Sequence, residues 1–195
     1  MRRRVKGLNF GKERESKVNL PLFQEVIIWI LEIALTVVIA VVFTYFFGVR
    51  SSMVGLSMSP QLEDGDEVLI DQFSYKFISP KAGDVIAFFP NGNTNTHYYM
   101  KRIIGVPGDR VQITDGMVLV NGDAYEEQTE VARMEDAGSA ADQITLGEDE
   151  YFVLGDNRNN SEDSRFANIG TVKDSYIIGK VWFVIAPKEK FGFMD

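Results

Sequence analysis

The chain has 195 residues, 45% of them hydrophobic and 25% charged, so it can bury one substantial core, which favours one globular domain with accessory segments. It contains no cysteine, which excludes disulfides, thiolate zinc sites and cysteine nucleophiles and leaves the redox compartment open. The formal net charge of -8 argues against a nucleic-acid-binding protein, because phosphate contacts need clustered Lys and Arg.

The charge is distributed unevenly along the chain. Residues 1–25 carry seven Lys or Arg and three acidic residues, whereas residues 51–195 carry twelve Lys or Arg and 24 acidic residues. We therefore expect a boundary between two parts of the chain near residues 26–50.

Residues 26–49 form a long apolar segment whose one ionisable group is Glu32. At about 1.5 Å per residue, a helix of this length crosses the ~30 Å hydrocarbon layer with some tilt. The segment is apolar around its whole circumference, which argues against a buried core helix. A cleaved secretory signal is the alternative, but its apolar region is only about 7 to 15 residues long. The sequence therefore predicts a single N-terminal transmembrane helix over residues 26–49.

The positive-inside rule gives the orientation of this helix. The basic cluster within residues 1–25 predicts a cytoplasmic tail. Residues 50–195 are then extracytoplasmic, which makes the protein a single-pass protein of the cell membrane.

Short apolar runs recur between turn signals after residue 50, as is typical of β-strands. The runs are EVLIDQF, GDVIAFF, RVQITDG, MVLVNGD, EYFVLGD and KVWFVIAP. The turn dipeptides Asp115-Gly116 and Asn121-Gly122 predict a hairpin or meander over residues 110–125. We expect a mainly β domain, an antiparallel sheet curled into a small barrel or folded sheets, with residues 126–149 as a surface excursion.

The catalytic options are few because the chain has one histidine and no cysteine. A Ser-His-Asp triad would have to use His97, which lies in a polar segment that is more simply interpreted as an exposed loop. One imidazole and scattered carboxylates do not make a compact ligand set. We therefore expect neither a metal nor a cofactor.

A first candidate segment, VGLSMSPQL, begins at Val54. Gly55 and Pro60 bracket Ser57 in a tight, non-helical backbone. Such a turn can expose the serine hydroxyl and direct its own N–H at an incoming carbonyl group. Taken alone, the segment fits a juxtamembrane linker equally well.

A second candidate segment, KRIIGVPGD, begins at Lys101 and follows the apolar-leaning HYYM. Lys101 is therefore expected on or beside a strand. A lysine is a useful base only when its amine is neutral, so its pKa of about 10.4 must fall by burial. A neutral amine beside a serine hydroxyl can take its proton, which is the Ser-Lys variant of triad chemistry. A solvated Lys-Arg pair is the alternative.

A third segment, GDNRNNSEDSR, follows the expected strand at residues 151–154. Self-bonding turns explain such polar loops by themselves. Together with SMSP and KRIIGVPGD, however, it resembles the conserved boxes SMxP, KRxxGxPGD and GDNRxxSxDSR of type I signal peptidases, and GDVIAFFP resembles the strand box between the first two. The resemblance covers the apolar segment and most of residues 50–185.

The resemblance implies a membrane-bound serine endopeptidase of peptidase family S26. It would remove signal peptides from exported preproteins at small-residue, Ala-x-Ala-like sites. Ser57 would be the nucleophile and Lys101 its general base, and Ser161 would hydrogen-bond and orient the Lys101 amine. The implied partners are signal-peptide-bearing preproteins and the lipid bilayer, and the oligomeric state stays open.

Further supporting residues follow from the same resemblance. Asp163 and Arg165 would form an ion pair near the site, and Arg102 would support it. Met58 and Pro60 would shape the turn beneath the substrate.

One position departs from part of the family. Some members carry a serine two residues before the nucleophile, and its hydroxyl completes the oxyanion hole. This chain has Gly55 there, so the second donor is unassigned. That glycine and the short stretch between Asp109 and Gly155 resemble the Gram-positive branch of the family. A lysine rather than a histidine at position 101 resembles the bacterial enzymes.

Two rival functions are distinguishable from the sequence. A Ser-Lys self-cleaving repressor would carry an N-terminal DNA-binding domain, where this chain has the apolar segment. An anchored β-domain that only binds partners would not depend on Ser57 or Lys101. For the apolar residues Phe77 and Ile78 we expect core packing rather than contact with lipid.

Overall fold

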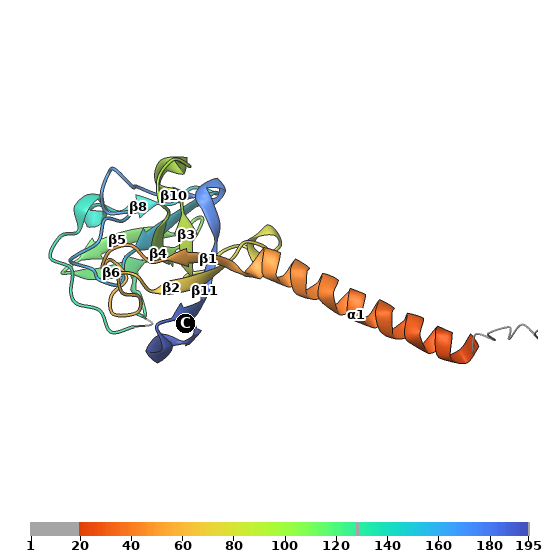
Figure 1. Ribbon diagram of the computed structural model, residues 1–195. Helices are drawn as coiled ribbons and strands as arrows, with labels where there is room; N and C mark the ends of the chain where they lie inside the picture. Colours follow the sequence, from red (N-terminus) through yellow and green to blue (C-terminus); the bar gives the residue numbers. More distant parts are fainter. Residues whose placement is uncertain (1–19, 128, 195) are drawn as a thin grey trace, which may run out of the picture. The chain divides into compact units, whose positions relative to one another are not determined.

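The computed structural model describes residues 20–127 and 129–194 (Figure 1). Contacts divide the chain into two units, residues 1–41 and 42–195. Residues 1–19 of the predicted cytoplasmic tail lie outside the described range. In chain order the helices and strands are α1 (Leu20–Phe47), β1 (Val49–Ser52), β2 (Glu67–Asp71), η1 (Ser74–Lys76), β3 (Val85–Phe88), η2 (Pro90–Gly92), β4 (Tyr99–Gly105), β5 (Arg110–Thr114), β6 (Met117–Val120), β7 (Asp123–Ala124), η3 (Gly138–Ala141), β8 (Ile144–Thr145), β9 (Glu150–Leu154), β10 (Val172–Lys173), η4 (Asp174–Tyr176), β11 (Ile177–Ala186), η5 (Lys188–Lys190) and β12 (Gly192–Phe193).

Helix α1 covers all but the last two residues of the predicted apolar segment, because it begins at Leu20 rather than residue 26 and ends at Phe47 rather than residue 49. The earlier start is possible because Pro21 lies in the first turn, where a missing N–H breaks no helical hydrogen bond. Side chains 21–45 are all exposed. By length and composition, Pro21–Tyr45 is a candidate membrane span.

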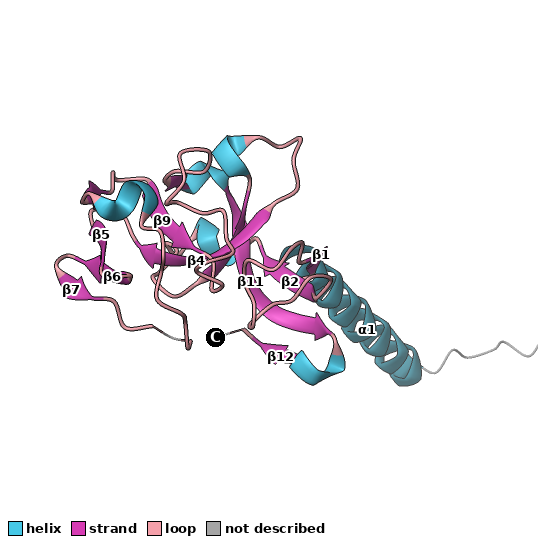
Figure 2. Ribbon diagram, turned by 90° about the vertical axis from the view of Figure 1, so that its left-hand side faces the viewer, coloured by secondary structure: helices cyan, strands magenta, loops and turns pink. Residues whose placement is uncertain are grey.

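The second unit consists mainly of two antiparallel sheets (Figure 2). The larger has the strand order β1-β2-β11-β3-β4-β9-β10, with β12 paired to β11, and the smaller has the order β7-β6-β5-β8. All six predicted runs form strands, namely β2, β3, β5, β6, β9 and β11. The expected mainly β, antiparallel architecture with one N-terminal helix is therefore confirmed.

The smaller sheet contains the predicted meander. Strands β5, β6 and β7 pair in sequence, and Asp115 and Asn121 have positive φ angles of 53° and 57° in the two turns, as expected for Asp-Gly and Asn-Gly turns. The meander over residues 110–125 is confirmed.

Residues 126–149 are not a separate domain, as expected, but they are more than a surface excursion. Met134, Ala140 and Leu146 are buried in the core cluster beneath the smaller sheet. Glu127 forms a two-pronged ion pair with the buried Arg158, with Nη1–Oε1 at 2.6 Å and Nη2–Oε2 at 2.7 Å. The excursion therefore supplies both apolar and charged contacts to the domain.

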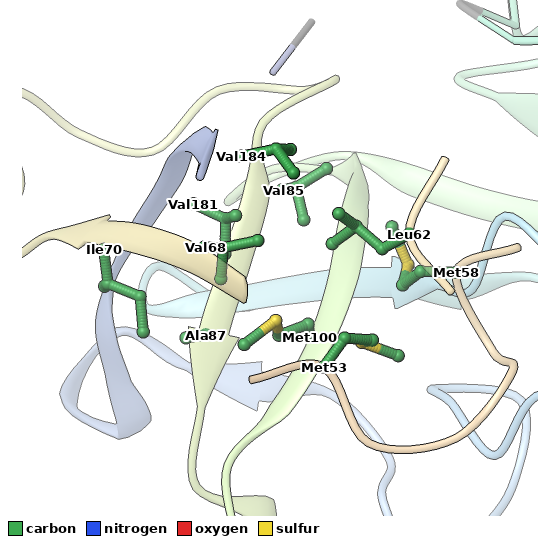
Figure 3. Packing of buried hydrophobic residues seen from close by; sticks show 10 residues of the cluster. All are labelled: Met53, Met58, Leu62, Val68, Ile70, Val85, Ala87, Met100, Val181 and Val184. Atoms are coloured by element: carbon green, nitrogen blue, oxygen red, sulfur yellow. The ribbon is translucent and has the colours of Figure 1, made fainter. Parts of the chain in front are cut away.

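A second core cluster lies beside the larger sheet and includes residues from the segment between β1 and β2. Met58 and Leu62 of that segment have no exposed surface, and they pack with Met53, Val68, Ile70, Val85, Ala87, Met100, Val181 and Val184 (Figure 3). This packing fixes the backbone on both sides of Met58, and so the position of the adjacent Ser57.

The expectation of core packing for two apolar residues is wrong. Phe77 is 74% exposed and Ile78 is 56% exposed. Both follow η1 in a loop, where strand alternation no longer directs side chains into the core. The Phe77 ring packs against the Phe73 ring, with centroids 5.0 Å apart.

We expect Ile70→Ala to destabilise the β-domain by about 2–5 kcal/mol, because it leaves a cavity in a fully packed core. Ile78→Ala, the matched control, should change the unfolding free energy by less than about 0.5 kcal/mol. Urea unfolding of the full chain in a mild detergent, followed by circular dichroism, measures both. Equal effects would contradict the described packing.

Candidate active site

Ser57 lies in a tight turn between β1 and β2. Gly55 has a φ of +84° with no atom within 4 Å of a hypothetical Cβ, so glycine is favoured there by conformation rather than by space. Its N–H donates to Asp64 Oδ1 at 2.7 Å. The Ser59–Pro60 peptide bond is cis, and the buried Met58 anchors the turn from below.

The loop that follows β9 holds this turn from the other side. The Asn157 N–H donates to the Ser57 carbonyl oxygen at 3.0 Å, and Asn157 Nδ2 donates to the Leu56 carbonyl oxygen at 3.1 Å. A Cβ on Gly155 would overlap the Ser57 carbonyl oxygen and Ser161 Oγ. The first and third motifs are therefore in direct contact.

Lys101 reaches the same turn from β4. Its side chain is 3% exposed, and its Nζ is hydrogen-bonded to Ser57 Oγ at 2.7 Å and to the Met100 carbonyl oxygen at 3.2 Å. The Tyr99 ring lies beside the amine, 5.2 Å from Nζ. The structure thus brings together the two residues that the sequence singled out.

Burial lowers the pKa of Lys101 to about 8, because the ammonium form loses its hydration. The carboxylates of Asp163, Glu162 and Asp156 oppose this shift. The neutral amine is therefore far more populated near neutral pH than in a lysine exposed to water.

Lys101 and Ser57 line an open cleft of about 380 Å³. The cleft is also lined by Met53, Val54, Gly55, Leu56, His97, Tyr98, Tyr99, Met100, Asn160 and Glu162. His97 is exposed, as expected. Within residues 20–127 and 129–194, His, Asp and Glu side chains form no group of three or more that could hold a metal ion.

Two buried ion pairs lie beside the cleft. Asp163 and Arg165 pair with Oδ1–Nε at 2.8 Å, as the resemblance implied. Arg102 pairs with Asp156 through one edge of its guanidinium group, with Nε–Oδ1 and Nη2–Oδ2 each at 2.9 Å. Successive residues of a strand point to opposite faces, so the neighbouring side chains contact different partners: Lys101 contacts Ser57, and Arg102 contacts Asp156.

The expected hydrogen bond between Ser161 and Lys101 is absent. Ser161 Oγ is buried and has no hydrogen-bond partner in the described part of the chain. The Lys101 amine instead makes its hydrogen bonds to Ser57 and to the Met100 carbonyl. Ser161 packs against Gly155, where it limits the room for any larger residue.

The sequence assigned no role to three residues that shape the site. Asn157 and Asp156 belong to the third motif, so the motif pointed to the loop but not to their contacts. Asp64 belongs to no motif, and no sequence signal marks its hydrogen bond to Gly55.

Comparisons with known proteins show the family of the chain. The family model described as signal peptidase, peptidase S26, matches residues 26–186. A signal peptidase I of Leptolyngbya laminosa is 36% identical over 167 residues, which cover 82% of this chain and 79% of the relative. A signal peptidase IB of Staphylococcus aureus (strain COL) is 32% identical over 185 residues, which cover 86% of this chain and 93% of the relative.

A solved structure, signal peptidase I from Enterococcus faecalis V583, is 30% identical with a TM-score of 0.43 and covers 53% of this chain and 97% of that chain. The family model spans most of the chain, both sequence relatives are matched along most of their length, and each of the three is described as a signal peptidase. The chain therefore belongs to the signal peptidase family, peptidase S26.

Proposed function

We propose that the chain is a membrane-bound signal peptidase in which Ser57 is the nucleophile and Lys101 the general base. Membership of the family makes it a serine peptidase with signal peptidase I activity. The observation that carries the assignment of residues is the 2.7 Å contact between Lys101 Nζ and Ser57 Oγ, at a cleft wall where the lysine is buried.

Acylation begins when the neutral Lys101 amine takes the Ser57 proton as Oγ attacks the scissile carbonyl carbon. The resulting ammonium returns that proton to the leaving nitrogen as the peptide bond breaks. The released chain then has a free amino group, and the signal peptide stays esterified to Ser57. In deacylation Lys101 takes a proton from water, the hydroxide attacks the ester, and the proton returns to Ser57.

Burial is what makes a lysine suitable for this role. A base works best when its pKa lies near the working pH. With a pKa of about 8, about one Lys101 amine in ten is neutral at pH 7. The fixed charges of Asp156 and Asp163 are balanced by arginines, which limits their stabilisation of the ammonium form.

The backbone of the nucleophile supports oxyanion stabilisation. Within the described residues the Ser57 N–H makes no hydrogen bond, so it is available to the negative charge that develops on the carbonyl oxygen. A preorganised donor of this kind contributes about 10²–10³ in rate. Asn157 donates hydrogen bonds to the carbonyl oxygens of both Leu56 and Ser57, which fixes the peptide planes on either side of Ser57.

We further propose that α1 is a retained anchor, with residues 1–25 cytoplasmic and residues 50–195 extracytoplasmic. The helix ends at Phe47 and β1 begins at Val49. At about 3.3–3.6 Å per extended residue, the ten residues from Phe47 to Ser57 keep the nucleophile within about 36 Å of the helix end. Substrates would be preproteins with small residues before the scissile bond, the usual pattern of signal-peptide cleavage sites.

We expect Ser57→Ala and Lys101→Ala each to lower cleavage of an Ala-x-Ala preprotein by about 10³-fold or more, because each removes half of the reacting pair. Lys101→Arg should be equally inactive, since its guanidinium stays protonated. Purified full-length variants in detergent, assayed by gel under single-turnover conditions, measure the loss. Ser59→Ala is the control in the same turn and should retain cleavage within about twofold. Near-normal cleavage by any of the first three would falsify the assignment.

The pH profile tests the protonation state of Lys101. Only the neutral amine is a base, so kcat/KM should rise about tenfold per pH unit on the acid side and reach half its plateau near pH 8. Initial rates from pH 6 to 10 at constant ionic strength give the profile. A flat profile, or a midpoint near the unperturbed lysine value of about 10.4, is incompatible with a buried catalytic amine.

Gly155→Ala tests the contact between the first and third motifs. The added methyl group would overlap both the Ser57 carbonyl oxygen and Ser161 Oγ, so we expect a loss of about 1–3 kcal/mol in stability and at least a tenfold loss of kcat. Gly192→Ala is the matched control, because a Cβ there meets no atom within 4 Å. Comparable behaviour of the two variants would show that the loop and the turn are not in tight contact.

A further inference from the structure

The acidic residues around the Lys101 amine are not equivalent. Three carboxylates act on it, those of Asp163, Glu162 and Asp156. Asp163 is buried and paired with Arg165, and Asp156 is buried and paired with Arg102. Their negative charges are therefore balanced within the protein.

Glu162 differs from both. It is exposed and lines the cleft together with Ser57 and Lys101. Across residues 20–127 and 129–194 the Glu162 side chain makes no hydrogen bond and no ion pair. The other titratable groups that line the cleft are His97, Tyr98, Tyr99 and Lys101. Glu162 is thus an acidic side chain that lacks a counterion among the described residues and that a substrate would meet on entering the cleft.

The position of Glu162 relates it to one side of the scissile bond. In the proposed mechanism Lys101 gives its proton to the leaving nitrogen, so the first residue of the released chain must lie close to Nζ. Glu162 is near enough to Nζ to favour its charged form. A substrate side chain just after the scissile bond would therefore interact electrostatically with the Glu162 carboxylate.

We propose that Glu162 is a specificity-determining residue that favours preproteins with a basic side chain, over those with an acidic one, at the first two positions after the scissile bond. This inference rests on the proposed function, because the side of the bond is defined by the roles of Ser57 and Lys101. The carboxylate attracts a Lys or Arg of the substrate, and it repels an Asp or Glu.

The expected selectivity is modest because Glu162 is solvated. Exposed ion pairs change an equilibrium by up to about fivefold, and repulsion of an acid adds a similar factor. We therefore expect kcat/KM to differ by about three- to tenfold between substrates with Lys and Glu at the same position. The difference should shrink as salt is raised, because exposed charges are screened.

The test uses full-length enzyme in detergent and two preprotein series that differ only at the first or second residue after the scissile bond, with Lys, Gln or Glu there. The wild type should cleave in the order Lys, Gln, Glu in at least one series. Glu162→Gln should bring the Lys-to-Glu ratio of kcat/KM to within about twofold of one, and Glu162→Lys should invert it. Glu130→Gln, an exposed acid outside the cleft with the same change in net charge, should keep the wild-type ratio.

Two results would overturn the inference: equal cleavage of all substrates by the wild type, or a charge preference that persists in Glu162→Gln. Ser57→Ala assayed on the same substrates separates this failure from that of the proposed function. If Ser57→Ala is inactive and the ratio is one, only the role of Glu162 fails. If Ser57→Ala cleaves normally, the assignment of the nucleophile fails.

Discussion

The site depends on the burial of one amine against one hydroxyl. A lysine in water holds its proton far too tightly to act as a base near neutral pH, and only the loss of hydration at position 101 changes this. Every other element of the site serves that geometry. Lys101 lies on strand β4, and the buried Met58 and Leu62 fix the turn that carries Ser57. Asn157, in the loop after β9, donates two hydrogen bonds to that turn.

The surrounding charges make the burial possible. Aspartates within reach of Lys101 would hold its proton if they were free, but each is tied to an arginine. The arginines are themselves buried, and such charges are tolerated only when paired and hydrogen-bonded. The two ion pairs therefore have an electrostatic consequence beyond holding the loops together. They balance two of the three carboxylates that act on the amine, and leave Glu162 as the third.

Much of this was predictable from the sequence, and the exceptions have physical causes. Three ordered motifs identified Ser57, Lys101 and the Asp163–Arg165 pair, because short motifs preserve the residue types that a reaction needs. The six predicted runs formed strands of four to ten residues, whereas β7, β8, β10 and β12 have two residues each, too few for any periodicity. Contacts between distant segments, such as Asn157 with Leu56, leave no local pattern. The orientation of Ser161 and the exposure of Phe77 in a loop leave no local sequence pattern either.

The pairing of Arg158 with Glu127 has an evolutionary consequence. The third motif places a guanidinium in the protein interior, and its counterion comes from the excursion between β7 and β8. Loop length costs little in closure entropy, so this excursion can lengthen or shorten between homologues, provided that a carboxylate still pairs with Arg158 and apolar side chains still fill the places of Met134 and Ala140. Grafting a foreign segment there is therefore limited by one acid and two core contacts rather than by its size.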